Sequence, residues 1–212
     1  MAFADVGDAV SGAIITEAWG DQARANFLAS APGVAAAEGD LIIATAANTV
    51  AALTVGTADS VLVAGAARPE WQIVPAVHLT KSDTTALSTS SWTSIPFDTE
   101  TSDTNTLHEG VTHPSYITIP TNGDGWYAFG FFGNATRAGS TGTWRARVLL
   151  NGTTVLAQGE VQGASGVASF ITIAGVYPLA ATNYIEAQYY TADASMTMAA
   201  SPMFWAIWVR RP

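Results

Sequence analysis

The chain has 212 residues, of which 49% are hydrophobic and only 12% are charged, whereas soluble domains usually carry about 25% charged residues. Its 17 acidic and 8 basic residues give a net charge of −9. This balance argues against nucleic-acid binding, which needs clustered lysine and arginine. The absence of cysteine excludes disulfides, thiolate zinc sites and cysteine nucleophiles. No apolar run reaches the roughly 20 residues of a membrane-spanning helix, and the first residues are acidic where a signal peptide is basic, so we expect no membrane insertion.

The few charged residues are concentrated in the first half of the chain. Thirteen of the 17 acidic residues and three of the 8 basic residues precede position 111, which leaves residues 111–212 almost neutral. The free surface of a soluble protein normally carries mixed charges. The second half is therefore expected either to form a compact β domain or to bury much of its surface in an assembly.

Residues 1–32 are predicted to form an N-terminal arm with one short helix, which ends near residue 30. Thr16 is a suitable N-cap, and Trp19, Ala23 and Phe27 recur at the spacing of one helical face. Pro32 disfavours helical geometry in the residue before it. A helix of about 15 residues is marginal alone, so we expect it to dock on the rest of the chain or on a neighbour.

Residues 33–71 contain three short apolar segments between turn-forming residues, a pattern typical of β-strands. These segments are residues 41–46, 50–56 and 61–65. Strands this short do not form a stable domain by themselves. Two interpretations stay open: a trimerising segment that gains a core by intertwining with identical copies, or three strands of one ordinary sheet.

Residues 72–212 are predicted to form a head domain built of β-strands, so the chain as a whole is mainly β. Asn151-Gly152, between two apolar runs, is a strong signal for a type I′ hairpin. About ten short strands at this spacing favour an antiparallel jelly-roll sandwich. The expected strands are 71–79, 91–97, 115–120, 125–133, 143–152, 153–161, 168–179, 183–191, 195–200 and 203–211.

Two of these strands are apolar on both faces. In the strand 125–133, Trp126 and Phe132 share one face while Tyr127 and Phe129 share the other, and the last strand repeats the pattern. A strand that covers a monomeric sandwich normally alternates apolar with polar residues. Contact with other copies would cover the second face, and a larger core is the alternative explanation.

Several stretches of the second half carry the motifs of a known family. They are Trp92, Ile95–Asp98, Tyr116–Pro120, Gly125–Phe129, Arg147–Gly152 and Phe204–Trp208. Through them, residues 92–212 resemble the trimeric jelly roll of the tumour-necrosis-factor and complement-globular-domain superfamily, in which the strands similar to 125–129 and 204–208 line the threefold interface. The resemblance implies a homotrimer whose interface contains Tyr127, Phe129, Phe131, Phe204, Trp205 and Trp208.

The first third of the chain resembles tailed-bacteriophage structural proteins. A virion-attachment region of such proteins resembles Gly12–Gly20 together with Arg24–Phe27. An intertwined trimeric shaft resembles Gly39–Trp71, in which the motifs GDL, G, VL and P-x-W follow in that order. The resemblance implies that Trp19, Arg24 and Phe27 bind other virion proteins. It also implies a location on the tail or capsid surface after synthesis in the host cytoplasm. No long stalk follows, so any fibre would be short.

No catalytic motif is present. The chain has no G-x-S-x-G elbow, Walker loop, dinucleotide fingerprint or H-E-x-x-H pair. The spacing of His78, His108 and His113 does not indicate a metal site. We therefore expect no enzyme activity, no catalytic residue and no cofactor.

The densest acidic run contains Asp98, Glu100 and Asp103. Carboxylate oxygens are ligands that Ca²⁺ prefers, which makes this run the candidate calcium site, with a solvated loop as the alternative. Two carboxyl groups at a suitable separation could also serve a capsule-degrading glycosidase. That enzyme is the least favoured of the functional hypotheses.

Trp144, Arg145 and Arg147 lie in one expected strand. An exposed aromatic ring beside an arginine could contact a glycan, and an arginine that pairs with an acid across an interface is the alternative.

These patterns together predict a non-enzymatic bacteriophage virion protein. A homotrimer would be anchored by its arm to other virion proteins and would project the head toward a host-surface glycan or protein, as a short tail fibre or receptor-binding protein. A capsid decoration or head-fibre protein is the alternative, with the same trimer on the shell.

Overall fold

The computed structural model of the chain describes residues 37–46, 49–58, 60–64, 68–87, 89–139, 142–192 and 196–210. Two compact units are present, Met1–Ile73 and Val74–Pro212. The predicted helix and the predicted attachment residues Trp19, Arg24 and Phe27 lie outside the described residues. The described residues form strands and turns, and none of them belongs to a helix that could cross a membrane.

The described part of the first unit consists of two antiparallel hairpins. β1 (Leu41–Ala46) pairs with β2 (Thr49–Leu53), and β3 (Ser60–Ala64) pairs with β4 (Pro69–Ile73). β1, β2 and β3 correspond to the three segments predicted over residues 41–46, 50–56 and 61–65, and β4 is an additional strand.

Two side chains connect these hairpins to their flanking turns. The Asp40 carboxylate accepts hydrogen bonds from the backbone N–H groups of Ala37, at 3.0 Å, and Val55, at 3.1 Å. The Trp71 ring covers Gly56 so closely that a Cβ there would lie 2.7 Å from Cγ of Trp71. The turn before β1 and the segment after β2 are thus held by specific contacts.

The strand predicted over residues 71–79 is wrong, because the structure divides it into two strands. β4 ends at Ile73, and β5 (Ala76–Thr80) begins in the other unit. Pro75 lies at the break, where it has no backbone N–H to donate to a sheet. The two halves consequently pair with different strands.

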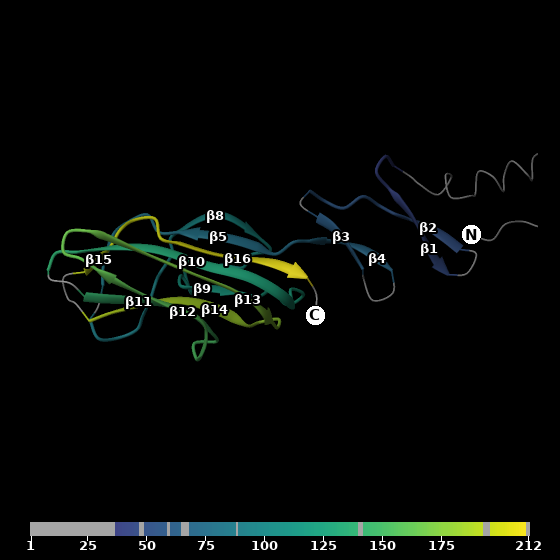
Figure 1. Cartoon of the computed structure of the whole chain (residues 1–212). Coiled ribbons are helices and arrows are strands. Elements are labelled where there is room, and N and C mark those ends of the chain that lie inside the picture. Colours follow the sequence, from purple (N-terminus) through teal and green to yellow (C-terminus); the bar gives the residue numbers. More distant parts are fainter. Residues whose placement is uncertain are drawn as a thin grey trace, which may run out of the picture. The chain divides into compact units, whose positions relative to one another are not determined.

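The second unit is an antiparallel jelly-roll sandwich of two sheets (Figure 1). The larger sheet has the order β13-β10-β16-β5-β8, and the short strands β15 and β6 extend it beside the end of β10. The smaller sheet has the order β12-β11-β14, with β7 and β9 both paired to β14. The chain crosses between the sheets after each of β6 to β10 and again after β12, β13 and β14, which is the winding of a jelly roll.

Apart from the divided segment 71–79, each predicted segment of this unit contains one strand, although β7 is shorter than predicted and β10 is longer. β8 was not predicted from the sequence, and neither was β6. The strands are β6 (Thr85–Ala86), β7 (Thr93–Ser94), β8 (Thr99–Thr104), β9 (Tyr116–Thr118), β10 (Gly125–Arg137), β11 (Gly142–Leu150), β12 (Thr154–Gly163), β13 (Ala168–Leu179), β14 (Tyr184–Thr191), β15 (Met196–Met198) and β16 (Met203–Arg210).

The turn between β11 and β12 has the geometry that its sequence predicts. Asn151 and Gly152 have φ angles of 49° and 69°, and the Thr153 N–H donates to the Leu150 carbonyl at 3.1 Å. Positive φ at both central residues is what a type I′ turn requires. The Asn151 side chain also accepts the backbone N–H of Tyr184 at 3.0 Å, which fixes the hairpin to the start of β14.

Alternate residues of both sheets fill the interior of the sandwich. From the larger sheet, Tyr127, Phe129 and Phe131 are at most 1% exposed, and Phe204 stacks on Phe97 with ring centroids 5.6 Å apart. The smaller sheet contributes Trp144, Ala146, Val148, Ile185, Ala187 and Tyr189. A single copy therefore has a complete apolar core, and the predicted mainly β, jelly-roll fold class is confirmed.

Candidate functional site

The side of the larger sheet that points away from the interior is the candidate functional site. Directly opposed residues of neighbouring strands point to the same side of a sheet, so the register defines this side. Gly130 pairs with Trp205, which in turn pairs with His78. We call this side the outer face. It consists of the even-numbered residues 170–178 of β13, 126–134 of β10 and 76–80 of β5, with the odd-numbered residues 203–209 of β16.

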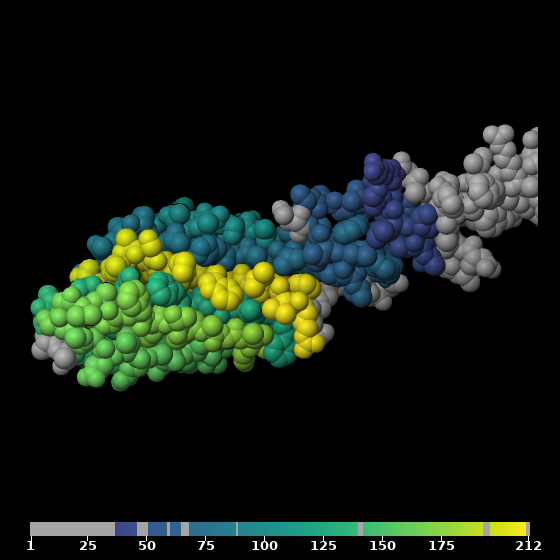
Figure 2. All heavy atoms as spheres, turned by 45° about the horizontal axis from the view of Figure 1, so that its top comes forward, coloured from purple at the N-terminus to yellow at the C-terminus, as the bar shows by residue number. Residues whose placement is uncertain are grey.

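The outer face is mostly apolar. Its residues include no Asp, Glu or Lys, and the one arginine beside them is Arg210, which is opposite Trp126 at the end of β16 and lies over its ring. Phe170 and Val176 are each 58% exposed, Val209 is 52% exposed and Ile207 is 43% exposed. In Figure 2 the atoms of β16, in yellow, lie at the surface between the blue-to-teal segment of β5 and β8 and the light-green segment of β13. A sheet that faces water on one side normally carries polar residues there, so this face is an exposed apolar patch.

Aromatic rings occupy the middle of the outer face. A Cβ at Gly130 would lie 2.8 Å from the Trp205 indole, so the indole lies across the backbone of β10 at a position where only glycine leaves room. Phe132 and Phe170 stack beside it, with ring centroids 6.1 Å apart. The rings therefore lie against the sheet and form a surface suited to packing.

Only one of the six predicted interface residues lies on this face. Trp205 does, whereas Tyr127, Phe129, Phe131 and Phe204 are at most 1% exposed and Trp208 is 9% exposed. These five side chains pack inside one sandwich, so they are not available to a second copy. The alternation of side chains along β10 and β16 showed that both faces of these strands are apolar, but it did not indicate which face packs against the other sheet.

Tyr127 illustrates how closed the interior is. Its hydroxyl donates a hydrogen bond to the Gly123 carbonyl at 2.6 Å. Burial, and secondarily the charge of Asp124, raises the pKa of the Tyr127 hydroxyl well above its usual range. Its hydroxyl is thus a satisfied structural group.

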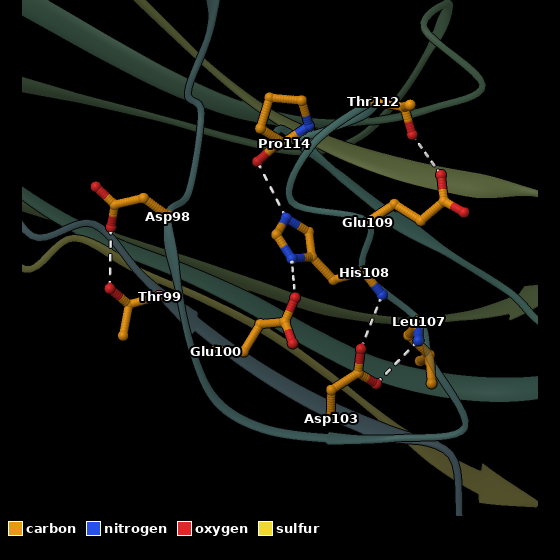
Figure 3. A network of polar contacts seen from close by, with 9 residues as sticks. All are labelled: Asp98, Thr99, Glu100, Asp103, Leu107, His108, Glu109, Thr112 and Pro114. Atoms are coloured by element: carbon orange, nitrogen blue, oxygen red, sulfur yellow. Dashed lines mark hydrogen bonds and ion pairs between the residues drawn. The ribbon is translucent and has the colours of Figure 1, made fainter.

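The three carboxylates of the candidate calcium site do not converge (Figure 3). Asp98 accepts hydrogen bonds from the backbone N–H and the hydroxyl of Ser82, both at 2.8 Å. Glu100 bonds to Nδ1 of His108 at 2.8 Å, and Asp103 accepts the His108 backbone N–H at 3.0 Å. In the part of the chain that the structure describes, no group of three or more His, Asp or Glu residues could hold a metal ion.

His108 is the centre of this network. Its side chain is 1% exposed, and Nε2 lies 3.2 Å from the Pro114 carbonyl oxygen (Figure 3). Burial, aided by the charge of Glu100, raises the pKa of the Asp103 carboxyl against its backbone hydrogen bonds. The network closes the loop between β8 and β9. Of the carboxyl groups considered for a glycosidase, Glu100 bonds to His108 within it, whereas Asp98 bonds to Ser82 and Thr99 outside it.

Trp144 is fully buried in the interior, so the prediction that it contacts a glycan is wrong. Arg145, the next residue, points to the outer side of the smaller sheet. It pairs with Glu160 of β12, and its guanidinium carbon lies 5.8 Å from the Tyr190 ring centroid. The arginine therefore pairs with an acid, as the alternative expected, but within one copy.

Arg147 lies on the same side of the smaller sheet, in a cluster whose other members the sequence analysis missed. The Arg147 guanidinium lies 4.0 Å from the Trp92 ring centroid and donates two hydrogen bonds to Oε1 of Gln188, at 3.0 and 2.7 Å. The Trp92 ring is 5.5 Å from that of Tyr190. The sequence signal for this cluster was the spacing of Arg145 and Arg147, which are two residues apart in one strand and therefore lie on the same face.

Comparisons with known proteins concern this jelly-roll unit. No protein-family model matches the chain, and no curated protein matches it either. The fold is similar to the globular domain of the zebrafish complement 1qA protein, with a TM-score of 0.47, 13% identity, and coverage of 65% of this chain and 99% of that one. It is also similar to murine APRIL in its crystal structure at pH 5.0, with a TM-score of 0.48, 12% identity, and coverage of 64% and 99%. At these identities no property of either protein is transferred to this chain.

Proposed function

We propose that this chain is a non-enzymatic structural protein that assembles as a homotrimer through the outer face. The jelly-roll unit would then serve as the receptor-binding head of a short bacteriophage tail fibre. The observation that carries the assembly is the outer face, which is rich in aromatic residues, carries no acidic residue and is exposed in a single copy. The threefold stoichiometry and the virion location rest on the sequence resemblances of residues 92–212 and of residues 12–71.

The contrast between the two sheets indicates which side is buried. The outer side of the smaller sheet carries ionic pairs such as Arg145 with Glu160, as expected of a surface that faces water. The outer face of the larger sheet carries none, and interface cores are depleted in charge and enriched in aromatic residues. Removing apolar surface from water stabilises an assembly by about 25 cal/mol per Å².

The first unit supports the same conclusion. Leu41, Ile42, Val61 and Leu62 are 38–44% exposed, although they belong to short strands that cannot form a stable domain alone. Intertwining of three copies would cover these side chains.

The mass of the full chain in solution tests the assembly. Light scattering during size exclusion should give three times the chain mass of 22.0 kDa. Ile207→Glu places a charge on the outer face and should give monomers, while Gln162→Glu, on the exposed outer side of β12, is the matched control and should leave the trimer intact. A wild-type monomer with native circular dichroism would refute the assembly.

The place of the trimer on the virion requires a separate experiment. Immunogold labelling of virions should mark the tail tip, and label on the shell would favour the capsid decoration or head-fibre alternative. Deleting residues 1–32 should leave the trimer intact but abolish its incorporation into particles, since the arm is proposed to bind other virion proteins.

The surface that contacts the host is proposed to be the outer side of the smaller sheet, which the trimer leaves free. Arg145, Arg147, Trp92 and Tyr190 provide adjacent rings and charged groups there, a combination suited to a glycan or a protein. Tyr190→Ala should weaken binding of the trimer to host cells while the mass stays trimeric, with Thr118→Ala on β9 as the control.

A further inference from the structure

His78 is the only titratable side chain among the residues that define the outer face. We propose that His78 makes this assembly sensitive to pH: the assembled trimer holds the imidazole neutral, and acid weakens the trimer. This inference rests on the proposed assembly through the outer face and adds its regulation.

The position of His78 follows from the burial pattern of β5. Val77 and Leu79 are at most 2% exposed and point into the sandwich, whereas His78 between them is half-buried and points outward. On β16 its direct neighbour is Trp205, and on β8 it is Ser102. His78 therefore lies in the central row of the outer face, beside the indole that covers Gly130.

No carboxylate on the strands beside His78 is placed to compensate a positive charge there. On β8, Asp103 is opposite Val77 and Glu100 is opposite Leu79, both on the inward side, and both carboxylates bond to His108. On β16 the outward residues are uncharged from Met203 to Val209.

The charged groups nearest the ends of these strands supply no carboxylate to His78. Lys81, which follows β5, pairs with Asp83 at 2.9 Å. Arg210, at the end of β16, lies over the Trp126 ring, 5.3 Å from its centroid. An imidazolium at position 78 would thus meet uncharged side chains on the neighbouring strands of its own copy and on the same face of any copy packed there.

Burial of a neutral imidazole costs little, but burial of an uncompensated cation is strongly unfavourable. Histidine side chains in general have a pKa of about 6.5 and are about 90% protonated at pH 5.5. A protonated imidazole must release its proton to enter such an interface. The association is then weakened about 10-fold for each copy, and about 10³-fold for three copies. At about pH 8 the same factor is close to one.

Sedimentation equilibrium of the full chain at about pH 8 and about pH 5.5, at one ionic strength, measures this effect. Circular dichroism and tryptophan fluorescence at both pH values establish that the fold is retained. His78→Gln keeps a neutral polar group at both pH values, and His78→Lys carries a charge at both. His113→Gln is the matched control, because the His113 side chain is 56% exposed, lies outside the outer face and pairs with Glu109.

We expect wild type and His113→Gln to associate about 10³-fold more weakly at the lower pH. His78→Gln should associate equally at both, and His78→Lys should already be weak at about pH 8. The inference is overturned if wild type associates equally at both pH values, if His78→Gln loses association as wild type does, or if His78→Lys assembles normally. A wild type that is monomeric at about pH 8 overturns the proposed assembly itself, which distinguishes the two failures.

Discussion

Phe131 and Phe132 are neighbours on β10, but their side chains point to opposite faces of the larger sheet. Phe131 is 1% exposed in the interior, where its ring also covers Gly133. Phe132 is half-buried on the outer face beside Phe170. Phe131→Ala should lower the free energy of unfolding by about 3–5 kcal/mol, the usual cost of removing a buried phenylalanine. Phe132→Ala should lower it by less than about 1 kcal/mol in a single copy and should weaken the assembly.

Urea unfolding followed by tryptophan fluorescence measures both effects, over a series of protein concentrations. Assembly stabilises the folded chain by mass action, so the loss in Phe132→Ala should grow with concentration, while the loss in Phe131→Ala should persist at the lowest concentration. Equal losses in the two variants at the lowest concentration would show that Phe132 is also a core residue. The assignment of the two faces from strand register would then be incorrect.

Three further substitutions test other parts of the structure. Gly130→Ala should displace the Trp205 indole, because the new Cβ would lie 2.8 Å from it, and should destabilise the domain by about 1–3 kcal/mol with a shifted tryptophan emission; an unchanged spectrum and stability would contradict this packing. Gly152→Ala should cost about 1–2 kcal/mol in urea unfolding because φ is 69° there, and a neutral result would mean that the turn is not type I′. Burial raises the pKa of the Asp98 carboxyl, but hydrogen bonds from Ser82 and Thr99 outweigh burial and lower this pKa below 3.8. The ionised carboxyl therefore stabilises the fold above about pH 4, and this contribution is lost as pH falls further. Asp98→Asn should therefore lower the melting temperature near neutral pH and have less effect at about pH 3; an equal effect at both would exclude ionisation as the cause.

Local chemistry predicted several elements well. Asn151-Gly152 determined its hairpin because positive φ at two successive residues is a local backbone property. The aromatic strands at β10 and β16 were evident from apolar residues at a period of two. β8 was missed because its sequence TETSDT contains no apolar residue, and its pairing with β5 is a contact between segments distant in the chain.

The sites were harder to predict than the strands. Trp144 was predicted to contact a glycan together with its neighbour Arg145. Adjacent residues of a strand point to opposite faces, however, and Trp144 faces the interior. The acidic run suggested a shared cation, but Asp98 bonds to Ser82, while Glu100 and Asp103 bond to the ring and the backbone N–H of His108. Residues that are close in the sequence therefore did not form a common site in either case.

The sequence by itself determined that this protein is mainly β, that its second half is short of charge, and that two of its strands are apolar on both faces. Only the tertiary structure decided which face of each strand is the core, because that depends on how strands far apart in the chain are ordered into two sheets. Tyr127 and Phe129 pack inward because β10 lies opposite the smaller sheet, and the row of Gly130, Trp205 and His78 is left outside. The low charge is thereby located on one exposed face, where burial against other copies would remove apolar surface from water.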